Sequence, residues 1–234
     1  MRDIWNDIPN NEKTGIRSLR LIAEPTTKKD ARNLGQYSKY EKSIEVTISN
    51  LSSGGDDAES ISKKTKSVIL HEIGHSKFDS YDDELKQKWS DEVLNYKPIS
   101  GYLKKFKANV TRSKNKLNGI IDEIEQQKKD WVADIDKFQK QIDSGKLSTD
   151  KDVFGNSKLD IAKDWVDKGN KAIKALDEEK LEYQKEHNMV VQSFGNETHS
   201  EFTVLKNGVE TFWKQDNSVY NELKPIYDKI LCSF

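Results

Sequence analysis

Cysteine, proline and long apolar runs are scarce in this chain. Of its 234 residues, one is cysteine and four are proline. A single cysteine excludes an intrachain disulfide and suits a reducing compartment. No run of about 18 apolar residues occurs, so no membrane-spanning helix is expected. The first residues lack the apolar segment of a signal peptide. We therefore expect a cytoplasmic protein without a membrane span.

A large net charge is also missing, although charged residues are abundant. Lysine and arginine number 39 and aspartate and glutamate number 40, so the formal net charge is −1. Such a balance provides no long-range field that would attract nucleic acid or an anionic membrane. Charged residues make up 34% of the chain and the mean hydropathy is −0.88, which indicates much solvated helical surface. Nucleic acid is therefore not an expected partner.

The strongest chemical signal lies at residues 71–75, which read His-Glu-Ile-Gly-His and directly follow a short apolar run. The preceding residues contain neither glycine nor proline, which favours a helix from about residue 60 to residue 77. Residues four apart share a helix face, so His71 and His75 project together and can occupy two corners of a zinc site. Glu72 could then take a proton from a metal-bound water. The alternative is a pair of ordinary hydrogen-bonded histidines.

This motif resembles the active-site helix of the zincin metallopeptidases. In the gluzincins among them, a glutamate from a second helix is the third zinc ligand, and an acidic residue four positions later supports a ligand histidine. Glu197 and Glu201 have that spacing, and Asn196 before Glu197 is similar to the Asn-Glu opening of the thermolysin-type motif. The resemblance implies Zn²⁺ bound by His71, His75 and Glu197. It implies that Glu201 either contacts a ligand histidine or is itself the alternative ligand.

The chain departs from the gluzincin pattern in two respects. Its second acid is glutamate where aspartate is common, and the gap between His75 and Glu197 is far longer than in compact gluzincins. A metzincin pattern fails, because Phe78 and Tyr81 stand where its glycine and third histidine would be. Asp79, one helical turn after His75, is an alternative ligand if the helix extends that far.

A segment of different character separates the two motifs. From residue 103 to 142, apolar residues step by alternating three and four, which predicts a helix of about 40 residues with a heptad seam. Residues 143–157 are a turn-rich connector, and a second seam continues to about residue 190. Two long helices joined by a short loop should pack antiparallel. Residues 193–196 are predicted to end the second helix, so that Glu197 begins a new one.

We predict an α+β fold, in which a zincin-like domain with a small mixed sheet and an active-site helix is interrupted by a long antiparallel coiled-coil hairpin. Residues 1–99 should hold the sheet and the HExxH helix, residues 100–190 the hairpin, and residues 191–234 C-terminal helices with the third metal ligand. Strands are expected at 16–24 and 43–49, from their β-branched and alternating residues. A short helix is expected at 26–33, from its possible threonine caps.

The resemblance implies a zinc metalloendopeptidase that hydrolyses peptide bonds by a metal-activated water, with Glu72 as general base. Its substrate would be a peptide or protein, and the segment 36–49 could offer an edge strand to an extended peptide. Tyrosine or histidine often stabilises the oxyanion in this class, and the candidates are His199, Tyr220 and His187. For His199 a surface position is expected, because it lies on a different helix face from Glu197.

Two other functions remain open from the sequence. The first is a catalytically weak or inactive zincin scaffold whose coiled-coil arm, residues 100–190, binds a protein partner. The second is a wholly helical interaction protein without a metal, which would contain no stoichiometric zinc. Fold type does not decide between them, since one scaffold supports many functions.

Overall fold

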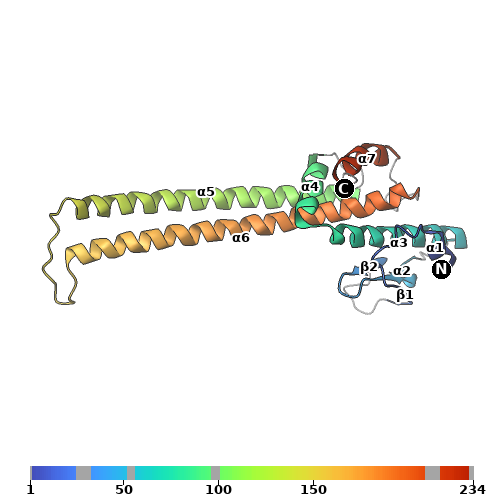
Figure 1. The fold of residues 1–234 in the computed structure, drawn as a ribbon, viewed down its shortest axis with the longest axis horizontal. Coiled ribbons are helices and arrows are strands. Elements are labelled where there is room, and N and C mark those ends of the chain that lie inside the picture. The colour runs from blue at the N-terminus through green and yellow to red at the C-terminus, as the bar shows by residue number, and fades with distance from the viewer. Residues whose placement is uncertain (1, 25–32, 52–55, 96–100, 209–216, 232–234) are drawn as a thin grey trace. The chain divides into compact units, whose positions relative to one another are not determined.

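A computed structural model describes most of the chain, and this part divides into two compact units (Figure 1). The first unit comprises Met1–Val110 and Val190–Phe234, and the second Thr111–Met189. The fold is α+β, as predicted, with many helices and one three-stranded mixed sheet. None of the described helices is both long enough and apolar enough to cross a bilayer. The described residues are 2–24, 33–51, 56–95, 101–208 and 217–231.

The sheet of the first unit places a strand with a free edge beside the HExxH helix. Strand β3 (Ser43–Thr47) is the central strand, in the order β1-β3-β2. It pairs with β1 (Ser18–Ile22) in parallel and with β2 (Gly35–Ser38) in antiparallel orientation. The two predicted strands are thus confirmed, although the chain turns into the short helix α2 (Ile48–Leu51) directly after β3. Within the described residues, β2 is paired on one side only.

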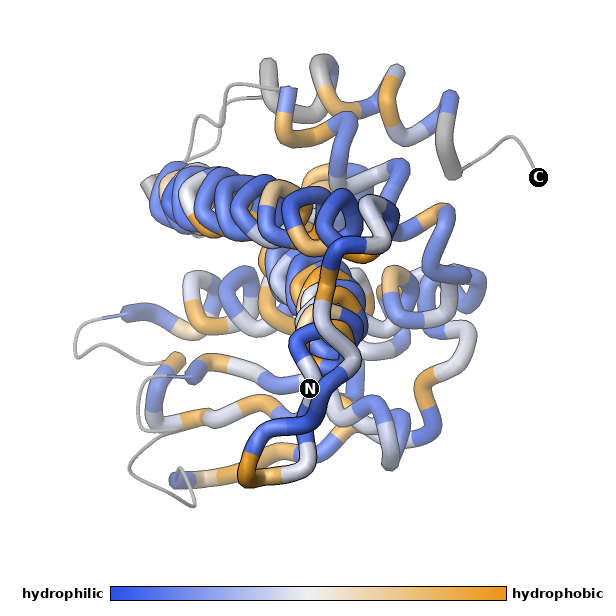
Figure 2. The backbone as a smooth tube through the Cα atoms, turned by 90° about the vertical axis from the view of Figure 1, so that its left-hand side faces the viewer, coloured by the Kyte–Doolittle hydropathy of each residue, from blue (hydrophilic) through white to orange (hydrophobic). Residues whose placement is uncertain are grey.

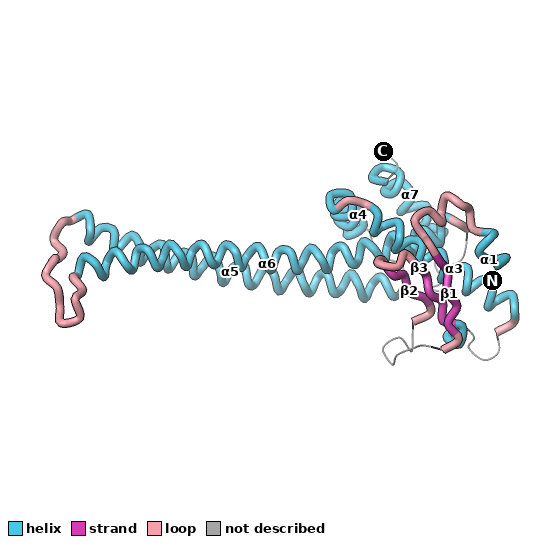
Figure 3. The backbone as a smooth tube through the Cα atoms, turned by 60° about the horizontal axis from the view of Figure 1, so that its bottom comes forward, coloured by secondary structure: helices cyan, strands magenta, loops and turns pink. Residues whose placement is uncertain are grey.

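Helix α3 (Ala58–Ser80) carries the HExxH motif and lies between the sheet and the last part of α6 (Lys158–Lys206) (Figures 1 and 3). Asp57 caps its start, where the carboxylate accepts the N–H of Ser60. The helix is longer than predicted at both ends. It packs against one apolar cluster on the sheet side and a second on the other side, so α3 is held from both faces. The clusters include Ile44, Val46, Ile69, Leu70 and Ile73 on the sheet side, and Phe78, Trp89, Phe194, Phe202 and Tyr227 on the other.

Besides α2, α3 and parts of two long helices, three further helices of the described residues belong to the first unit. They are α1 (Arg2–Asp7), α4 (Asp83–Asn95) and α7 (Asn217–Leu231), and α4 packs against α7. Hydrophobic and hydrophilic residues alternate along the helices (Figure 2), as expected for elements with one buried face. The helix predicted at 26–33 lies outside the described residues, apart from Asn33.

The predicted helix break at residues 193–196 is wrong, because α6 continues through them to Lys206. Gly195 serves close packing there rather than helix termination: a Cβ on it would overlap the side chain of Ser90 in α4. Trp89 reinforces this contact by donating its indole N–H to the Gly195 carbonyl, with 2.8 Å between the atoms. Glu197 is therefore an interior helix residue, and the dipole of a helix N-terminus does not explain its presence.

The second unit consists of antiparallel segments of α5 (Gly101–Asp143) and α6, joined by the connector at 144–157. Lys128 pairs with Asp177 at 2.6 Å, and the rings of Phe138 and Trp165 stack with centroids 5.8 Å apart. Residue numbers rise along α5 as they fall along α6 in these pairs, which makes the two helices antiparallel. The unit starts at residue 111 rather than 100, because Leu103 and Val110 belong to a core cluster of the first unit.

Glu12 joins three distant segments of the first unit and should be important for stability. Its side chain is 4% exposed; Lys77 of α3 donates to Oε2, and Nζ of Lys206 in α6 lies 3.3 Å from Oε1. Burial by itself raises the pKa of Glu12, but the two lysines outweigh it and hold the pKa below its ordinary value. The carboxylate therefore contributes stability that is present near neutral pH.

Glu12→Gln should lower the free energy of unfolding at pH 7 by roughly 3 kcal/mol, because it leaves two lysines without their buried partner. A lowered native pKa means that this contribution is full above the unfolded pKa of about 4.3 and is lost as the pH falls through the native value. Urea unfolding at pH 7 and at pH 3 measures it, and the stability difference between the two proteins should be smaller at the lower pH. A difference that is equal at both values would contradict the ion-pair explanation.

Candidate metal centre

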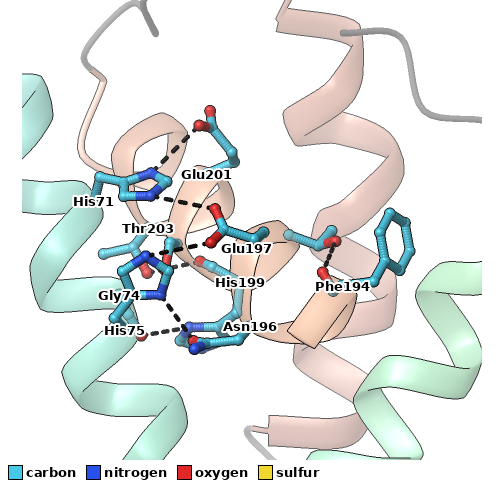
Figure 4. A network of polar contacts seen from close by, with 11 residues as sticks. His71, Gly74, His75, Phe194, Asn196, Glu197, His199, Glu201 and Thr203 are labelled. Atoms are coloured by element: carbon cyan, nitrogen blue, oxygen red, sulfur yellow. Dashed lines mark hydrogen bonds and ion pairs between the residues drawn. The ribbon is translucent and has the colours of Figure 1, made fainter. Parts of the chain in front are cut away.

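Helices α3 and α6 come into backbone contact at the centre of the HExxH motif. A Cβ on Gly74 would overlap the Cα of Ser200. Glycine at this position therefore permits an approach that any larger residue would prevent. The contact brings the face of α3 with His71 and His75 opposite the face of α6 with Glu197, as Figure 4 shows.

His71, His75 and Glu197 each offer one ligand atom to a group in which all three atoms lie within 4.8 Å of one another. His71 Nε2 is 3.6 Å from Glu197 Oε2, and His75 Nε2 is 3.8 Å from Glu197 Oε1. The side chains are between 16% and 21% exposed, so the group is open on one side. No other histidine, cysteine or carboxylate group of this kind is found among the described residues.

The other ring nitrogen of each histidine faces a hydrogen-bond acceptor. His71 Nδ1 lies 3.3 Å from Glu201 Oε1. His75 Nδ1 lies 2.9 Å from Asn196 Oδ1 and 2.8 Å from Ser200 Oγ. Because carboxylate and amide oxygens only accept, both histidines are held with the proton on Nδ1. Their Nε2 atoms face Glu197, and metal-ligating histidines likewise keep Nδ1–H on an acceptor while Nε2 is the atom that binds the ion.

The charges of the site also suit a cation. Burial by itself lowers the pKa of His71, but its contacts with Glu197 and Glu201 outweigh that effect and raise the pKa to about 10. A divalent cation would replace the proton held there. Glu201 Oε2 is buried without a hydrogen-bond partner in the described part of the chain. A buried carboxylate oxygen with no donor is costly unless positive charge is nearby, so the residues present fit a divalent metal.

Glu72 lies beside this group in a cleft of about 650 Å³. Its side chain is largely buried, and its carboxylate lies against β2: a Cβ on Gly35 would be 3.1 Å from Glu72 Oε1. The cleft is therefore formed by β2 and its flanks on one side and by α3 and α6 on the other. Its lining includes Leu34, Gln36, Tyr37, Lys39, His71, Glu72, His75, Asp79, Asn196, Glu197 and Glu201.

The alternative ligands are not part of the three-residue group. Helix α3 does extend to Asp79, but Asp79 is 2.6 Å from Lys39 Nζ and forms an ion pair with it at the cleft. Glu201 faces His71 from the Nδ1 side, and Glu197 is the carboxylate on the Nε2 side. Glu197 is thus the third member of the group.

The two histidines among the candidate oxyanion donors do not line the cleft. The expectation of a surface position for His199 is wrong, because its side chain is fully buried behind the contact of α3 with α6. His187 belongs to the second unit, where its Nδ1 lies 3.1 Å from Ser113 Oγ. Tyr220 is in α7, and its side chain lies outside the described residues. Neither His199 nor His187 lines the cleft.

The sequence interpretation missed the contact of Asn196 and Ser200 with His75. These two residues are four apart, as Glu197 and Glu201 are, so both pairs lie on neighbouring strips of one helix. The four-residue spacing of Asn196 and Ser200 is present in the sequence. The predicted helix break at residues 193–196, however, left Asn196 outside the helix that carries Glu197, Ser200 and Glu201.

Gly74→Ala tests the contact of the two helices. In an unconstrained helix, alanine would stabilise by about 1 kcal/mol. Here the added methyl group must push α3 away from Ser200, so we expect a loss of about 1–3 kcal/mol in unfolding free energy. Gly119→Ala is the matched control, because a Cβ at that helical position meets nothing within 4 Å. Urea unfolding compares the two, and a Gly74→Ala protein as stable as Gly119→Ala would contradict the contact.

Comparison of the chain with models of protein families, with curated proteins and with solved structures gives no match. The case for a function therefore depends on the geometry of this site.

Proposed function

We propose that this protein is a zinc-dependent metallopeptidase of gluzincin-like type. The observation that carries the proposal is the convergence of His71, His75 and Glu197 beside Glu72 in an open cleft. Two imidazoles and one carboxylate are a donor set of catalytic zinc sites, which keep one position open for water or substrate. Structural zinc sites more often use four protein ligands and are closed.

Zinc held by these residues would supply a Lewis acid that makes water a nucleophile near neutral pH. The other functions belong to the chain itself. Glu72 accepts the proton of the attacking water and later donates it to the nitrogen of the departing amine. Glu201 and Asn196 orient His71 and His75 through their Nδ1 atoms, as described above.

Strand β2 supports the proposal that the substrate is an extended peptide. It is an edge strand within the described residues, and Gly35 and Gln36 line the cleft next to Glu72. A peptide added along this edge would form main-chain hydrogen bonds that depend little on its sequence. Its backbone would then pass the three-residue group, with side chains alternating toward and away from the cleft.

Chelation is the direct test of the proposal. Protein purified without added metal should contain close to one zinc per chain, and it should cleave a mixture of unstructured peptides. Dialysis against a chelator should abolish the cleavage, and one equivalent of Zn²⁺ should restore it. The proposal is wrong if cleavage survives complete removal of the metal, or if the chain binds no zinc when zinc is supplied.

A second function, binding of a protein partner by the helical arm, is favoured by the connector of the second unit. Val153 and Phe154 are 94% and 84% exposed. In the turn that presents them, the Asp152 carboxylate accepts the N–H groups of Phe154 and Asn156. Exposed aromatic residues on a hydrogen-bonded turn are common at contact sites. Zinc bound without any peptide turnover would favour a scaffold whose arm does the binding.

A further inference from the structure

His199 is fully buried close to the candidate metal centre, although no step of the proposed hydrolysis uses it. It lies in α6 two residues from Glu197 and two from Glu201, and its side chain has no exposed surface. Aromatic rings surround it with centroids 5.6–5.9 Å away; they belong to Phe78, Tyr81, Trp89 and Tyr227. Such an enclosure would suit an apolar residue better than an imidazole.

One atom explains why the residue is a histidine. His199 Nδ1 lies 3.0 Å from the carbonyl oxygen of Gly74, and since a carbonyl only accepts, Nδ1 carries the proton and donates it. The opposite nitrogen, Nε2, is buried and has no hydrogen-bond partner among the described residues. A buried acceptor without a donor destabilises the fold. Phenylalanine would avoid that cost, so the useful feature of His199 is its bond to Gly74.

The hydrogen bond matters for the metal centre because of where Gly74 lies. Gly74 lies between the two histidines of the motif, at the point where α3 touches Ser200. The bond crosses between the helices at that point and links the backbone of α3 to a side chain of α6. Ligand geometry in metal sites depends on such supporting contacts, which hold side chains within fractions of an ångström.

We propose that His199 is a positioning residue of the metal centre, whose Nδ1–H group holds the Gly74 carbonyl and thereby keeps His71 and His75 opposite Glu197. This inference rests on the proposed zinc site. It assigns His199 no contact with metal or substrate. It predicts that metal affinity follows the hydrogen bond at Nδ1, whereas fold stability follows the packing of the aromatic ring.

Three substitutions separate these two properties. His199→Phe keeps a ring and removes the donor. His199→Asn keeps an amide N–H near the place of Nδ1 and removes the ring, whereas His199→Gln carries its amide one carbon farther out, near the place of Nε2. The measurements are the Zn²⁺ dissociation constant of the folded protein by chelator competition, the visible absorption of the Co²⁺ form, and urea unfolding without metal.

We expect His199→Phe to be at least as stable as the unsubstituted chain but to bind Zn²⁺ about 10–100-fold more weakly, the usual cost of losing a contact that supports a ligand. His199→Asn should be less stable yet retain the Zn²⁺ affinity and the Co²⁺ spectrum. His199→Gln should lose both stability and affinity. The Asn and Gln pair decides the question even if the Phe variant does not fold, because both amides lose the ring and only one keeps the donor in place.

Two outcomes would overturn the inference, and they differ from failure of the proposed function. If the Phe variant keeps full Zn²⁺ affinity and an unchanged Co²⁺ spectrum, or if the Asn and Gln variants lose affinity equally, His199 is a packing residue only. If the unsubstituted chain itself binds no Zn²⁺, the proposed function is wrong, and the inference is overturned with it.

Discussion

Glu72→Gln should lower kcat/KM for peptide hydrolysis by a factor of about 10²–10⁴, the usual contribution of a general base, without lowering the zinc content. Glutamine has the shape of glutamate but cannot accept a proton at neutral pH. Glu72 is outside the His71, His75 and Glu197 group, so the three ligand atoms stay in place. The measurement combines initial rates on one peptide with elemental analysis of the same sample.

Asp79→Asn is the matched control for this experiment. Asp79 also lines the cleft, but its carboxylate is paired with Lys39 and lies outside the three-residue group. Loss of an exposed ion pair of this kind costs about 0–1 kcal/mol, so hydrolysis should remain close to that of the unsubstituted chain. A Glu72→Gln protein that binds zinc and cleaves peptide at the full rate would remove Glu72 from the mechanism. Equal losses in both variants would indicate a general effect of charge in the cleft.

Local periodicity predicted the parts of the fold that depend on neighbours in the sequence. The alternation at 43–49 predicted a strand, and β3 is that strand. The heptad steps after residue 103 predicted one long helix, and α5 is that helix. The spacing of His71 and His75 placed both imidazoles on one face of α3, because four residues are close to one helical turn. These features need no knowledge of distant contacts.

Distant contacts decided the features that the sequence interpretation missed. Gly195 was predicted to be part of a helix break, but it is the point where α6 meets Ser90 of α4, which lies far earlier in the chain. His199 was expected at the surface because its helix face differs from that of Glu197. The helix has partners on both of these faces, however, and Trp89 and Tyr227 cover the second one. Periodicity shows which face is apolar but not which element covers it.

The two acidic residues of α6 should respond differently to neutralisation. Glu197→Gln removes the carboxylate that faces both Nε2 atoms, so it should weaken Zn²⁺ binding by more than about 10²-fold, beyond the range for a supporting contact. Glu201→Gln keeps an oxygen that can accept from His71 Nδ1–H but removes its negative charge, and it should weaken binding by no more than about 10–100-fold. Chelator competition on the two variants and the unsubstituted chain measures both effects on one scale.

The reverse order would make Glu201 the ligand and Glu197 its support. That result would place the metal on the Nδ1 side of His71, because His71 presents Nδ1 to Glu201 and Nε2 to Glu197. Ser200→Ala provides an internal control, since Ser200 touches His75 and neither carboxylate is changed. If all three variants lose Zn²⁺ affinity equally, neutralising the two carboxylates does not distinguish the ligand from its supporting residue. The double variant Glu197→Gln/Glu201→Gln then tests whether the two carboxylates act on one site, because contributions to a shared site are non-additive whereas independent contributions add.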